Sequence, residues 1–485
     1  MKPRWLVLVL AAGCTDNTVT VSPIIDVPAN DSASAFPLDQ LVLSVAEAGS
    51  SADLVSQTFA KGTQVSLPGV PFGNDLVIHM TGRVGSSEIA YGRTCTIAIA
   101  AEGTTPPSPH LFFAREVKFA DLDLTLQPEA RQDGVAITDV DGAGLIFGGV
   151  DPGTTTPNGE IERFDPQTGE LRLLASPPEV SPRVGAVAAP LGVGGDTRIA
   201  LIGGTANGSG ATFIELVQPD GPAGRRVDRV DDTLMARAEL TATALTDGRV
   251  IAIGGRDGTA PSDAVDEVTI DNGSATVRVL RATLAVPRYA HTATRLGDDV
   301  GAPVLVSGGL DLNGAPVALG ELFKPLGEKF ADPTMFKPSL NVPRYHHQAV
   351  RMPDGSVLII GGIDADNQTG VDELELFTLD GGFVNVGKLP TNAGLIDFAA
   401  TPLPDGRVLL TGGRRTVGGT PLDTALIARL DPIDGTVDVV ATDHMSVPRA
   451  GHSATLLCDG TVFVSGGTAD QPPAARYIPP ALDRR

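Results

Sequence analysis

The sequence contains little of several residue types on which particular functions depend. Aromatic residues make up only 4% of the 485 residues, and the single Trp is Trp5. Acidic residues outnumber basic residues by 58 to 36, which gives a formal charge of −22. Because nucleic-acid binding depends on clustered Lys and Arg, we expect no nucleic-acid partner.

Motifs for cofactor and metal chemistry are also missing. The three cysteines form no CxxC pair and no Cys/His cluster, which argues against thiol redox chemistry and a zinc site. No P-loop, HExxH, Gly-x-Ser-x-Gly or dinucleotide fingerprint occurs in a fitting context. We therefore expect no cofactor and no bound metal.

The only long apolar run lies at the N-terminus, where Lys2 and Arg4 precede the apolar residues 5–12. A run of this length cannot span a bilayer, which takes about 20 residues, but it suits a signal peptide over residues 1–13. The segment LAAGC resembles the lipobox of bacterial lipoproteins, and the resemblance implies lipidation of Cys14 and a tether over 14–36. Thr15 follows the cysteine, so the Asp that retains enterobacterial lipoproteins in the inner membrane is absent. We expect attachment to the membrane through the lipid only, at the outer membrane; an ordinary cleaved signal is the alternative.

What the sequence has in abundance is 57 Gly and 38 Pro, with many Val, Leu, Ala and Thr. This composition favours short strands joined by turns and predicts an all-β fold. Residues 37–103 contain four or more strand-like runs and predict a small β-sandwich. A Pro-rich linker over 104–112 leads to the rest of the chain, residues 113–485.

A repeat of 51 to 55 residues fills most of the remaining chain. Each of seven copies has an apolar run ending in two glycines: Gly148–Gly149, Gly203–Gly204, Gly254–Gly255, Gly308–Gly309, Gly361–Gly362, Gly412–Gly413 and Gly466–Gly467. Six copies also carry an arginine upstream: Arg131, Arg183, Arg237, Arg288, Arg344 and Arg449. Leu395 replaces it in the sixth copy, and an alanine follows five residues later in all seven.

The order Arg-x-x-His-x-Ala, Asp-Gly-x-Val-Leu, Gly-Gly and Glu-x-Phe-Asp-Pro resembles the kelch repeat of bacterial propellers and of the galactose oxidase central domain. The resemblance covers about residues 131–480. It implies a seven-bladed kelch propeller over 113–485, with the Arg-to-Ala stretch as the innermost strand of each blade. The last copy lacks a fourth strand, so we expect residues 117–126 to supply it and close the ring. With Trp5 in the signal, packing between blades should depend on aliphatic residues such as Leu171, Leu173 and Val440.

An acid in the third strand of most copies is a candidate partner for the arginine: Glu162, Glu215, Glu267, Glu321 and Glu375. The sixth copy has Leu395 and Ala428 at the two positions, as an ion pair within one blade predicts. The seventh copy keeps Arg449 opposite Ala475. We favour structural ion pairs; the alternative is a ring of arginines that reads an anionic ligand.

Histidines recur three residues after the arginine in three copies, at His291, His347 and His452. We interpret them as structural residues bonded within their own blades, with a metal site as the alternative. Galactose oxidase holds copper with tyrosines and histidines, but Tyr289 and Tyr345 occupy a repeat position, so copper oxidase activity is not carried over. Residues 310–314 and 363–370 are faintly similar to calcium loops. Cys95 and Cys458 remain after lipidation and could form a disulfide in an oxidising compartment.

These observations predict a non-catalytic, monomeric lipoprotein of the cell envelope. Its propeller would bind a protein or glycan through the loops between the second and third strands, which vary among the copies. These loops are residues 150–159, 205–211, 256–263, 311–318, 364–371 and 414–422. Two alternatives stay open: a periplasmic carbohydrate-active enzyme, since some kelch propellers that resemble this one epimerise sialic acid, and a structural envelope protein.

Overall fold

The structure is a computed structural model, and it describes residues 18–28, 38–60, 62–100, 108–206, 209–221, 224–231, 236–271, 273–332, 338–390, 394–467 and 474–480. Within these ranges the fold is all-β, which confirms the predicted class. The only helical turns described are the 3₁₀ turns η1 (Gly194–Asp196) and η2 (Pro325–Gly327). No helix in the described part of the chain is long and apolar enough to cross a membrane. The predicted signal peptide and Cys14 lie outside the described residues.

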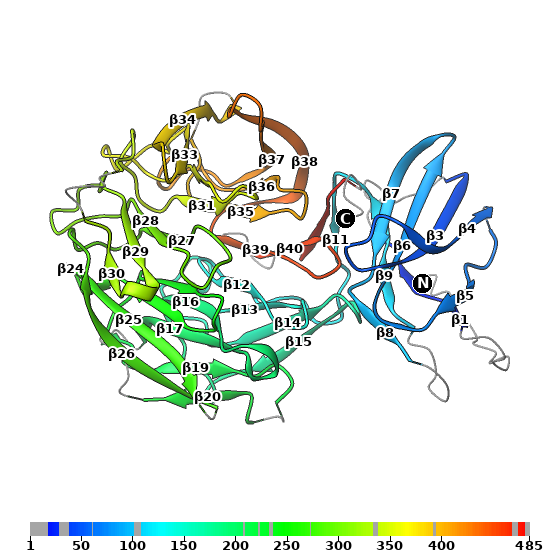
Figure 1. Cartoon of the computed structure of the whole chain (residues 1–485), viewed down its shortest axis with the longest axis horizontal. Coiled ribbons are helices and arrows are strands. Elements are labelled where there is room, and N and C mark those ends of the chain that lie inside the picture. Colours follow the sequence, from blue (N-terminus) through cyan, green and yellow to red (C-terminus); the bar gives the residue numbers. More distant parts are fainter. Residues whose placement is uncertain are drawn as a thin grey trace.

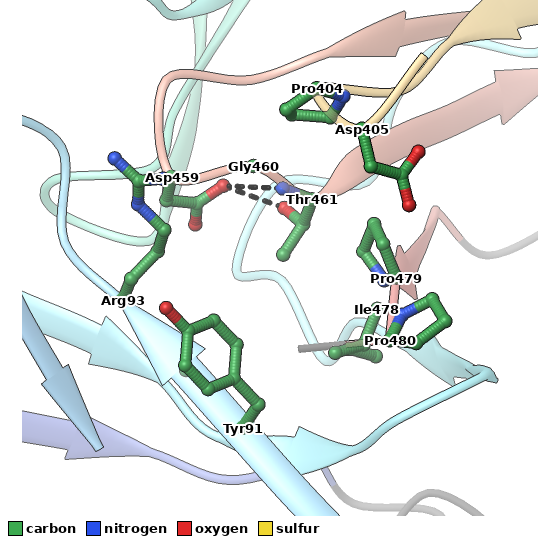
Figure 2. A pocket seen from close by; sticks show the side chains of 11 residues that line it. Tyr91, Arg93, Pro404, Asp405, Asp459, Gly460, Thr461, Ile478, Pro479 and Pro480 are labelled. Atoms are coloured by element: carbon green, nitrogen blue, oxygen red, sulfur yellow. Dashed lines mark hydrogen bonds between the residues drawn. The ribbon is translucent and has the colours of Figure 1, made fainter. Parts of the chain in front are cut away.

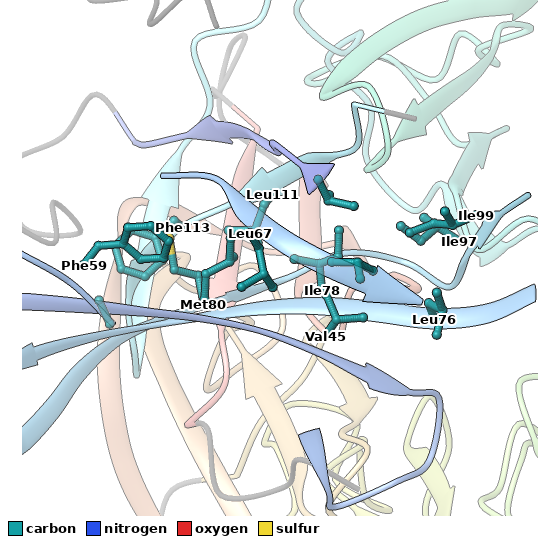
Figure 3. Close-up of a cluster of buried hydrophobic side chains, with 14 of the residues drawn as sticks. Val45, Phe59, Leu67, Leu76, Ile78, Met80, Ile97, Ile99, Leu111 and Phe113 are labelled. Atoms are coloured by element: carbon teal, nitrogen blue, oxygen red, sulfur yellow. The ribbon is translucent and has the colours of Figure 1, made fainter. Parts of the chain in front are cut away.

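The N-terminal domain is built from one six-stranded sheet and two small sheets. The large sheet has the order β10 (Ala114–Arg115), β7 (Ser87–Arg93), β6 (Gly73–Val84), β3 (Gln40–Glu47) and β4 (Asp53–Ala60), and β8 (Ile97–Ile99) also pairs with β6. The small sheets are β1 (Thr18–Val21) with β5 (Leu67–Pro71) and β2 (Ile24–Asp26) with β9 (His110–Phe112). The apolar side chains between these layers form one core (Figure 3).

This core corrects the expected boundaries of the tether and the linker. Val21 of β1 is buried in it, so the middle of the segment 14–36 belongs to the domain. Leu111 of β9 is fully buried beside it, which makes the end of the predicted linker a strand as well. The alternation in Thr18–Val21 is four residues long, too short for the sequence alone to distinguish from a polar tether.

Seven sheets of four main strands follow, and we number them in chain order. The strands of sheets 1 to 3 are β12 (Val135–Thr138), β13 (Gly144–Phe147), β14 (Ile161–Asp165) and β15 (Glu170–Ala175); β16 (Val184–Leu191), β17 (Arg198–Ala206), β19 (Ile214–Val217) and β20 (Val227–Val230); and β21 (Thr241–Ala244), β22 (Val250–Ile253), β25 (Ala264–Asp271) and β26 (Ser274–Thr283). β18 (Ser209–Gly210) extends sheet 2, and β23 (Arg256–Asp257) pairs with β24 (Ala260–Pro261).

Sheets 4 to 7 continue the series around the molecule (Figure 1). Their strands are β27 (Thr292–Arg295), β28 (Val304–Ser307), β29 (Glu321–Lys324) and β30 (Lys329–Phe330); β31 (Gln348–Arg351), β32 (Val357–Ile360), β33 (Glu373–Thr378) and β34 (Gly382–Lys388); β35 (Ala399–Pro402), β36 (Val408–Thr411), β37 (Leu422–Leu430) and β38 (Val437–Arg449); and β39 (His452–Leu456), β40 (Val462–Gly466), β41 (Ala475–Ile478) and β11 (Lys118–Asp121).

The segment before the repeats supplies the fourth strand of sheet 7. β11 pairs antiparallel with β41, with Phe119 opposite Tyr477. The strand is shorter than the expected span 117–126, because Asp121 is its last paired residue. β11 thus covers the edge of β41, whose N–H and C=O groups would otherwise be left unpaired.

Consecutive sheets are joined by hydrogen bonds at the double glycines. In six of the seven sheets, the second glycine donates its N–H to the carbonyl of the residue at the arginine position of the next sheet. The pairs are Gly204 to Arg237, Gly255 to Arg288, Gly309 to Arg344, Gly362 to Leu395, Gly413 to Arg449 and Gly467 to Arg131. The last pair joins sheet 7 back to sheet 1 at 2.7 Å.

Packing between sheets is largely aliphatic, as in the cluster shared by sheets 2 and 3, but two of the three residues named from the sequence are exposed. Leu173 and Val440 are exposed at 43% and 58%, and of the three residues named only Leu171 is buried. Phenylalanines contribute between sheets 1 and 7, where Phe164 stacks on Phe463 with ring centroids 4.4 Å apart. The repeated alanines are partly buried, and each packs against an apolar cluster.

Candidate functional site

Five of the repeated arginines form buried ion pairs inside their own sheets. The pairs are Arg131–Glu162, Arg183–Glu215, Arg237–Asp266, Arg288–Glu321 and Arg344–Glu375. Each arginine is at most 2% exposed. The alternative of an arginine ring that reads an anionic ligand is therefore wrong, since a ligand cannot reach these guanidinium groups.

Two details of the predicted pairs are corrected by the strand register. In sheet 3 the partner of Arg237 is Asp266, and Glu267 instead binds Arg249 and Arg278. In sheet 6 the residue opposite Leu410 is Leu426, so Leu426 and not Ala428 stands in the acid position. Neighbouring residues of a strand point to opposite faces, so an error of one residue selects Glu267 in place of Asp266. In sheet 6 the error is two residues along the same face of the strand.

The three repeated histidines also have structural roles, but toward the preceding sheet. Nε2 of His291 lies 3.2 Å from Thr241 Oγ1 of sheet 3, and Nε2 of His452 lies 2.8 Å from Thr411 Oγ1 of sheet 6. His347 makes the same kind of contact with Thr292 of sheet 4, at 2.9 Å. Our expectation of bonds within their own blades is wrong. Burial is the main cause that lowers the pKa of His291 and of His452 to about 3, so both rings are neutral at physiological pH.

A second repeat position, two residues after the arginine, brings different side chains together at the centre. All seven residues there have left-handed backbone, with φ between 50° and 67°. They are Asp133, Gly185, Glu239, Ala290, His346, Asp397 and Gly451. Five of their N–H groups donate to the carbonyl of the equivalent residue in the preceding sheet, over 2.7 to 3.2 Å. The donors are Asp133, Glu239, Ala290, His346 and Gly451.

We call the titratable members of this position and the two arginines that lie beside them the central cluster: Asp133, Glu239, His346, Asp397, Arg256 and Arg414. Arg256 Nε donates to Glu239 Oε1 at 3.0 Å and also lies over the ring of Tyr289. Arg414 Nε lies 3.5 Å from Asp397 Oδ2. Sequence reasoning missed this cluster, because its seven positions share a backbone conformation and no side-chain chemistry.

The groups of the central cluster influence one another's protonation. Crowding by protein atoms and the nearby charge of Asp397 raise the pKa of Asp133 to about 6, although Asp133 contacts solvent. The pKa of His346 is lowered, mainly by desolvation; the charges of Glu239 and Asp397 oppose this shift. A carboxyl that titrates near neutral pH can take part in proton transfer or adapt to the charge of a ligand.

The loops between the second and third strands leave from the same end of the sheets as the central cluster. Bridges join Ala238 to Arg256, Tyr345 to Ile363 and Ile396 to Arg414, so each loop starts beside the left-handed position of its own sheet. We call this end the loop face. The hairpins between the first and second strands, such as that at Asp354–Gly355, lie at the opposite end of the inner strands.

The described residues do not assemble the metal sites considered from the sequence. No group of three or more His, Cys, Asp or Glu suited to a metal ion occurs among them. In the loops similar to calcium sites, Asp311 and Asp366 accept backbone N–H groups of their own loops. These contacts are those of ordinary turns stabilised by an aspartate.

Comparison with known proteins identifies a distant structural likeness. No protein-family model matches the chain, and no curated protein matches it. Among solved structures, a fungal alcohol oxidase of the AA5 family, in complex with copper, is similar with a TM-score of 0.56 and 16% identity, over 75% of this chain and 76% of that chain. At this identity the likeness concerns the fold alone: a galactose oxidase-like arrangement of β-sheets.

Proposed function

We propose that the chain is a seven-bladed kelch-type propeller, anchored at the cell envelope through Cys14, that binds a protein or glycan partner on its loop face. Sheets 1 to 7 would be the blades. Support for the ring comes from the hydrogen bonds that run from sheet to sheet and from Gly467 back to Arg131. The lipid anchor rests on the sequence LAAGC alone.

The observation that carries the binding function is the position of the central cluster on the loop face. Titratable side chains from sheets 1, 3, 5 and 6 gather where six variable loops begin. All six arginines at the repeat position are buried, five of them in ion pairs, so recognition falls to this cluster and to the loops. Loops on a rigid scaffold are the usual carriers of binding residues.

Capture from an envelope extract tests this proposal. The bait is the purified chain with Cys14→Ser, and the variant is Glu239→Gln with Arg256→Gln, which removes one ion pair of the central cluster. The matched control is Arg351→Gln, which breaks the pair with Asp298 (2.7 Å) at the opposite end of the inner strands. We expect a partner or glycan that the Arg351 variant retains and the cluster variant loses. Equal capture by both variants would refute loop-face binding at the cluster.

The anchor is tested separately. Growth with labelled palmitate should label the wild-type protein and leave the Cys14→Ser variant unlabelled and free of the membrane fraction. Several acyl chains are needed for stable attachment, so the variant should be fully released. An unlabelled wild-type protein would favour the ordinary cleaved signal.

One observation favours a second candidate, a periplasmic carbohydrate-active enzyme such as a sialic-acid epimerase. The raised pKa of Asp133, close to 6, suits a group that exchanges protons near neutral pH. Nuclear magnetic resonance can follow how fast freshly dissolved N-acetylneuraminate equilibrates with and without the protein. Acceleration that is lost in Asp133→Asn would establish the enzyme; no acceleration, with capture intact, would leave the binding protein.

Copper chemistry does not extend from the similar alcohol oxidase to this chain. Of the tyrosines, the hydroxyl of Tyr477 is 2.9 Å from Thr442 Oγ1 in sheet 6, and Tyr289 lies beneath Arg256. The histidines His291, His347 and His452 are buried against hydroxyl groups of neighbouring sheets. Because these side chains already have structural partners, the residues present do not fit a copper site, and we propose no oxidase step.

A further inference from the structure

A pocket lies between the N-terminal domain and sheets 6 and 7 (Figure 2). One wall is Tyr91–Arg93 of β7. The other walls are the hairpin residues Pro404–Asp405 of sheet 6 and Asp459–Thr461 of sheet 7, and the chain end Ile478–Pro480. Neither domain alone encloses this space, so the pocket exists only in the complete chain.

The two carboxylates in the pocket wall already have cationic partners. Asp405 is paired with Arg407, and Asp459 is paired with Arg476. Asp459 also accepts hydrogen bonds from the N–H of Thr461 at 3.1 Å and from its hydroxyl at 2.7 Å. These acids are neutralised by the protein itself and do not require a cation from outside.

Arg93 is the exception among the charged groups of the wall. No ion pair joins its guanidinium group to a carboxylate in the described part of the chain, whereas the carboxylates of Asp405 and Asp459 are paired with other arginines. Its Nε is buried and has no hydrogen-bond acceptor in the part of the chain that the structure describes. A guanidinium group in a pocket wall without a carboxylate partner is a candidate anion-binding group.

The rest of the pocket wall is mostly apolar. Pro404, Pro479, Pro480 and Ile478 line the pocket with the ring of Tyr91. Guanidinium groups bind carboxylates through two parallel hydrogen bonds, and rigid apolar walls favour an apolar group next to the anion. We propose that this pocket binds a carboxylate carried beside an apolar group, with Arg93 as the anion-binding residue.

The disulfide between Cys95 and Cys458 fixes the two sides of the pocket. Cys95 lies two residues after Arg93, and Cys458 directly precedes Asp459. Its Cα atoms are 4.9 Å apart and join positions separated by 363 residues. The bond thus holds Arg93 opposite the hairpin of sheet 7 and gives the N-terminal domain a part in ligand binding.

Calorimetry with a matched pair of probes tests the proposal. The probes are N-acetylleucine and N-acetylleucinamide, which differ in the charge of the terminal group and otherwise have nearly the same shape. We expect the acid to bind the intact, disulfide-bonded chain at least about tenfold more tightly than the amide, because hydrogen bonds to charged groups contribute about 1.5–3 kcal/mol. Equal binding of both probes, or no binding of either, would overturn the proposal.

Variants separate the role of Arg93 from folding. Arg93→Gln should weaken binding of the acid about tenfold or more and leave binding of the amide unchanged, whereas Arg93→Lys should keep part of the preference. The control is Arg83→Gln on the adjacent strand β6, where Arg83 binds Glu88 at 2.5 Å outside the pocket. Circular dichroism reports whether each variant is folded. A folded Arg93→Gln variant that retains the preference for the acid would refute the assignment of Arg93.

Discussion

The buried pair of Arg344 and Glu375 offers a quantitative test of how each sheet is held together. Arg344 donates to the carbonyls of Val342 (3.0 Å), Gly361 (3.2 Å) and Glu373 (2.9 Å), and to Glu375 Oε1 at 2.7 Å. Neither residue of the pair has measurable exposure. Arg344→Leu therefore removes the cation from a buried carboxylate, to which Asn341 and the Val342 N–H still donate, and takes the guanidinium donor from three carbonyls.

Removal of one partner from a buried ion pair costs about 3–5 kcal/mol, and we expect Arg344→Leu to fall in this range. Glu375→Leu should cost a similar amount, because it leaves the guanidinium group uncompensated. The double variant recreates the apolar pair that Leu395 and Leu426 form in sheet 6. It should be more stable than the sum of the two single effects predicts, by about 2 kcal/mol or more.

Urea unfolding followed by circular dichroism measures these differences in the free energy of unfolding. Tryptophan fluorescence would not serve, because the only tryptophan, Trp5, lies in the predicted signal peptide. Glu373→Gln, which breaks the exposed pair with Lys388 (2.8 Å) in the same sheet, serves as the control and should cost less than about 1 kcal/mol. Strict additivity of the two leucine substitutions would refute the view that arginine and acid act as one unit.

Three further predictions follow from the same contacts. Gly361→Ala should strongly lower the melting temperature in thermal unfolding, because the new Cβ would lie 2.5 Å from the carbonyl oxygen of Leu395. Gly148→Ala has a similar φ, but its Cβ would lie 3.2 Å from the nearest atom, so it should lower the melting temperature less. His291→Leu introduces the residue type that sheet 3 has at this position, Leu240, and should reduce the loss of stability on acidification. Burial lowers the pKa of His291 to about 3, so only the unfolded chain binds this proton between about pH 6.5 and 3, and the stability of the wild type falls by about 2 kcal/mol from pH 6.5 to 5. A flat difference between variant and wild type over this pH range would contradict that reasoning. Cys458→Ser should lower stability by about 2–4 kcal/mol, and Cys95→Ser should add nothing further to it, as thermal unfolding of the single and double variants can show.

The sequence was sufficient for the features that repeat. Seven double glycines with a period of 51 to 55 residues predicted the strands that end at them, because each glycine pair has the same steric task in each copy. At Gly254, for example, a Cβ would lie 2.7 Å from the carbonyl oxygen of Arg288 and 2.6 Å from His291 Cε1 of the next sheet. A steric requirement of this kind allows only glycine at the position in each copy, so the repeat can be recognised from the sequence alone.

Features that depend on register or on distant pairing were beyond the sequence. Glu267 was chosen over Asp266 because both are acidic and adjacent, and only the pairing of Asp266 with Ala252 shows which one faces Arg237. The sequence predicts a tether where strand β1 lies, because the partner strand β5 is almost 50 residues downstream and no local pattern indicates the pairing. The pocket at Arg93 combines four segments from two domains, and no local pattern indicates such a combination.

The central cluster shows how a repeated backbone can carry a function that does not repeat. The left-handed position is held in each sheet by backbone contacts, and glycine, found at Gly185 and Gly451, is the residue that adopts this conformation without strain. The five other residues carry a cost of about 1 kcal/mol or more each, yet three of them are acids and one is a histidine. Structure alone would favour glycine at all seven positions. Asp133, Glu239, His346 and Asp397 occupy this position despite that cost, so their side chains, and not the backbone conformation, are the part of the repeat that the proposed ligand would test.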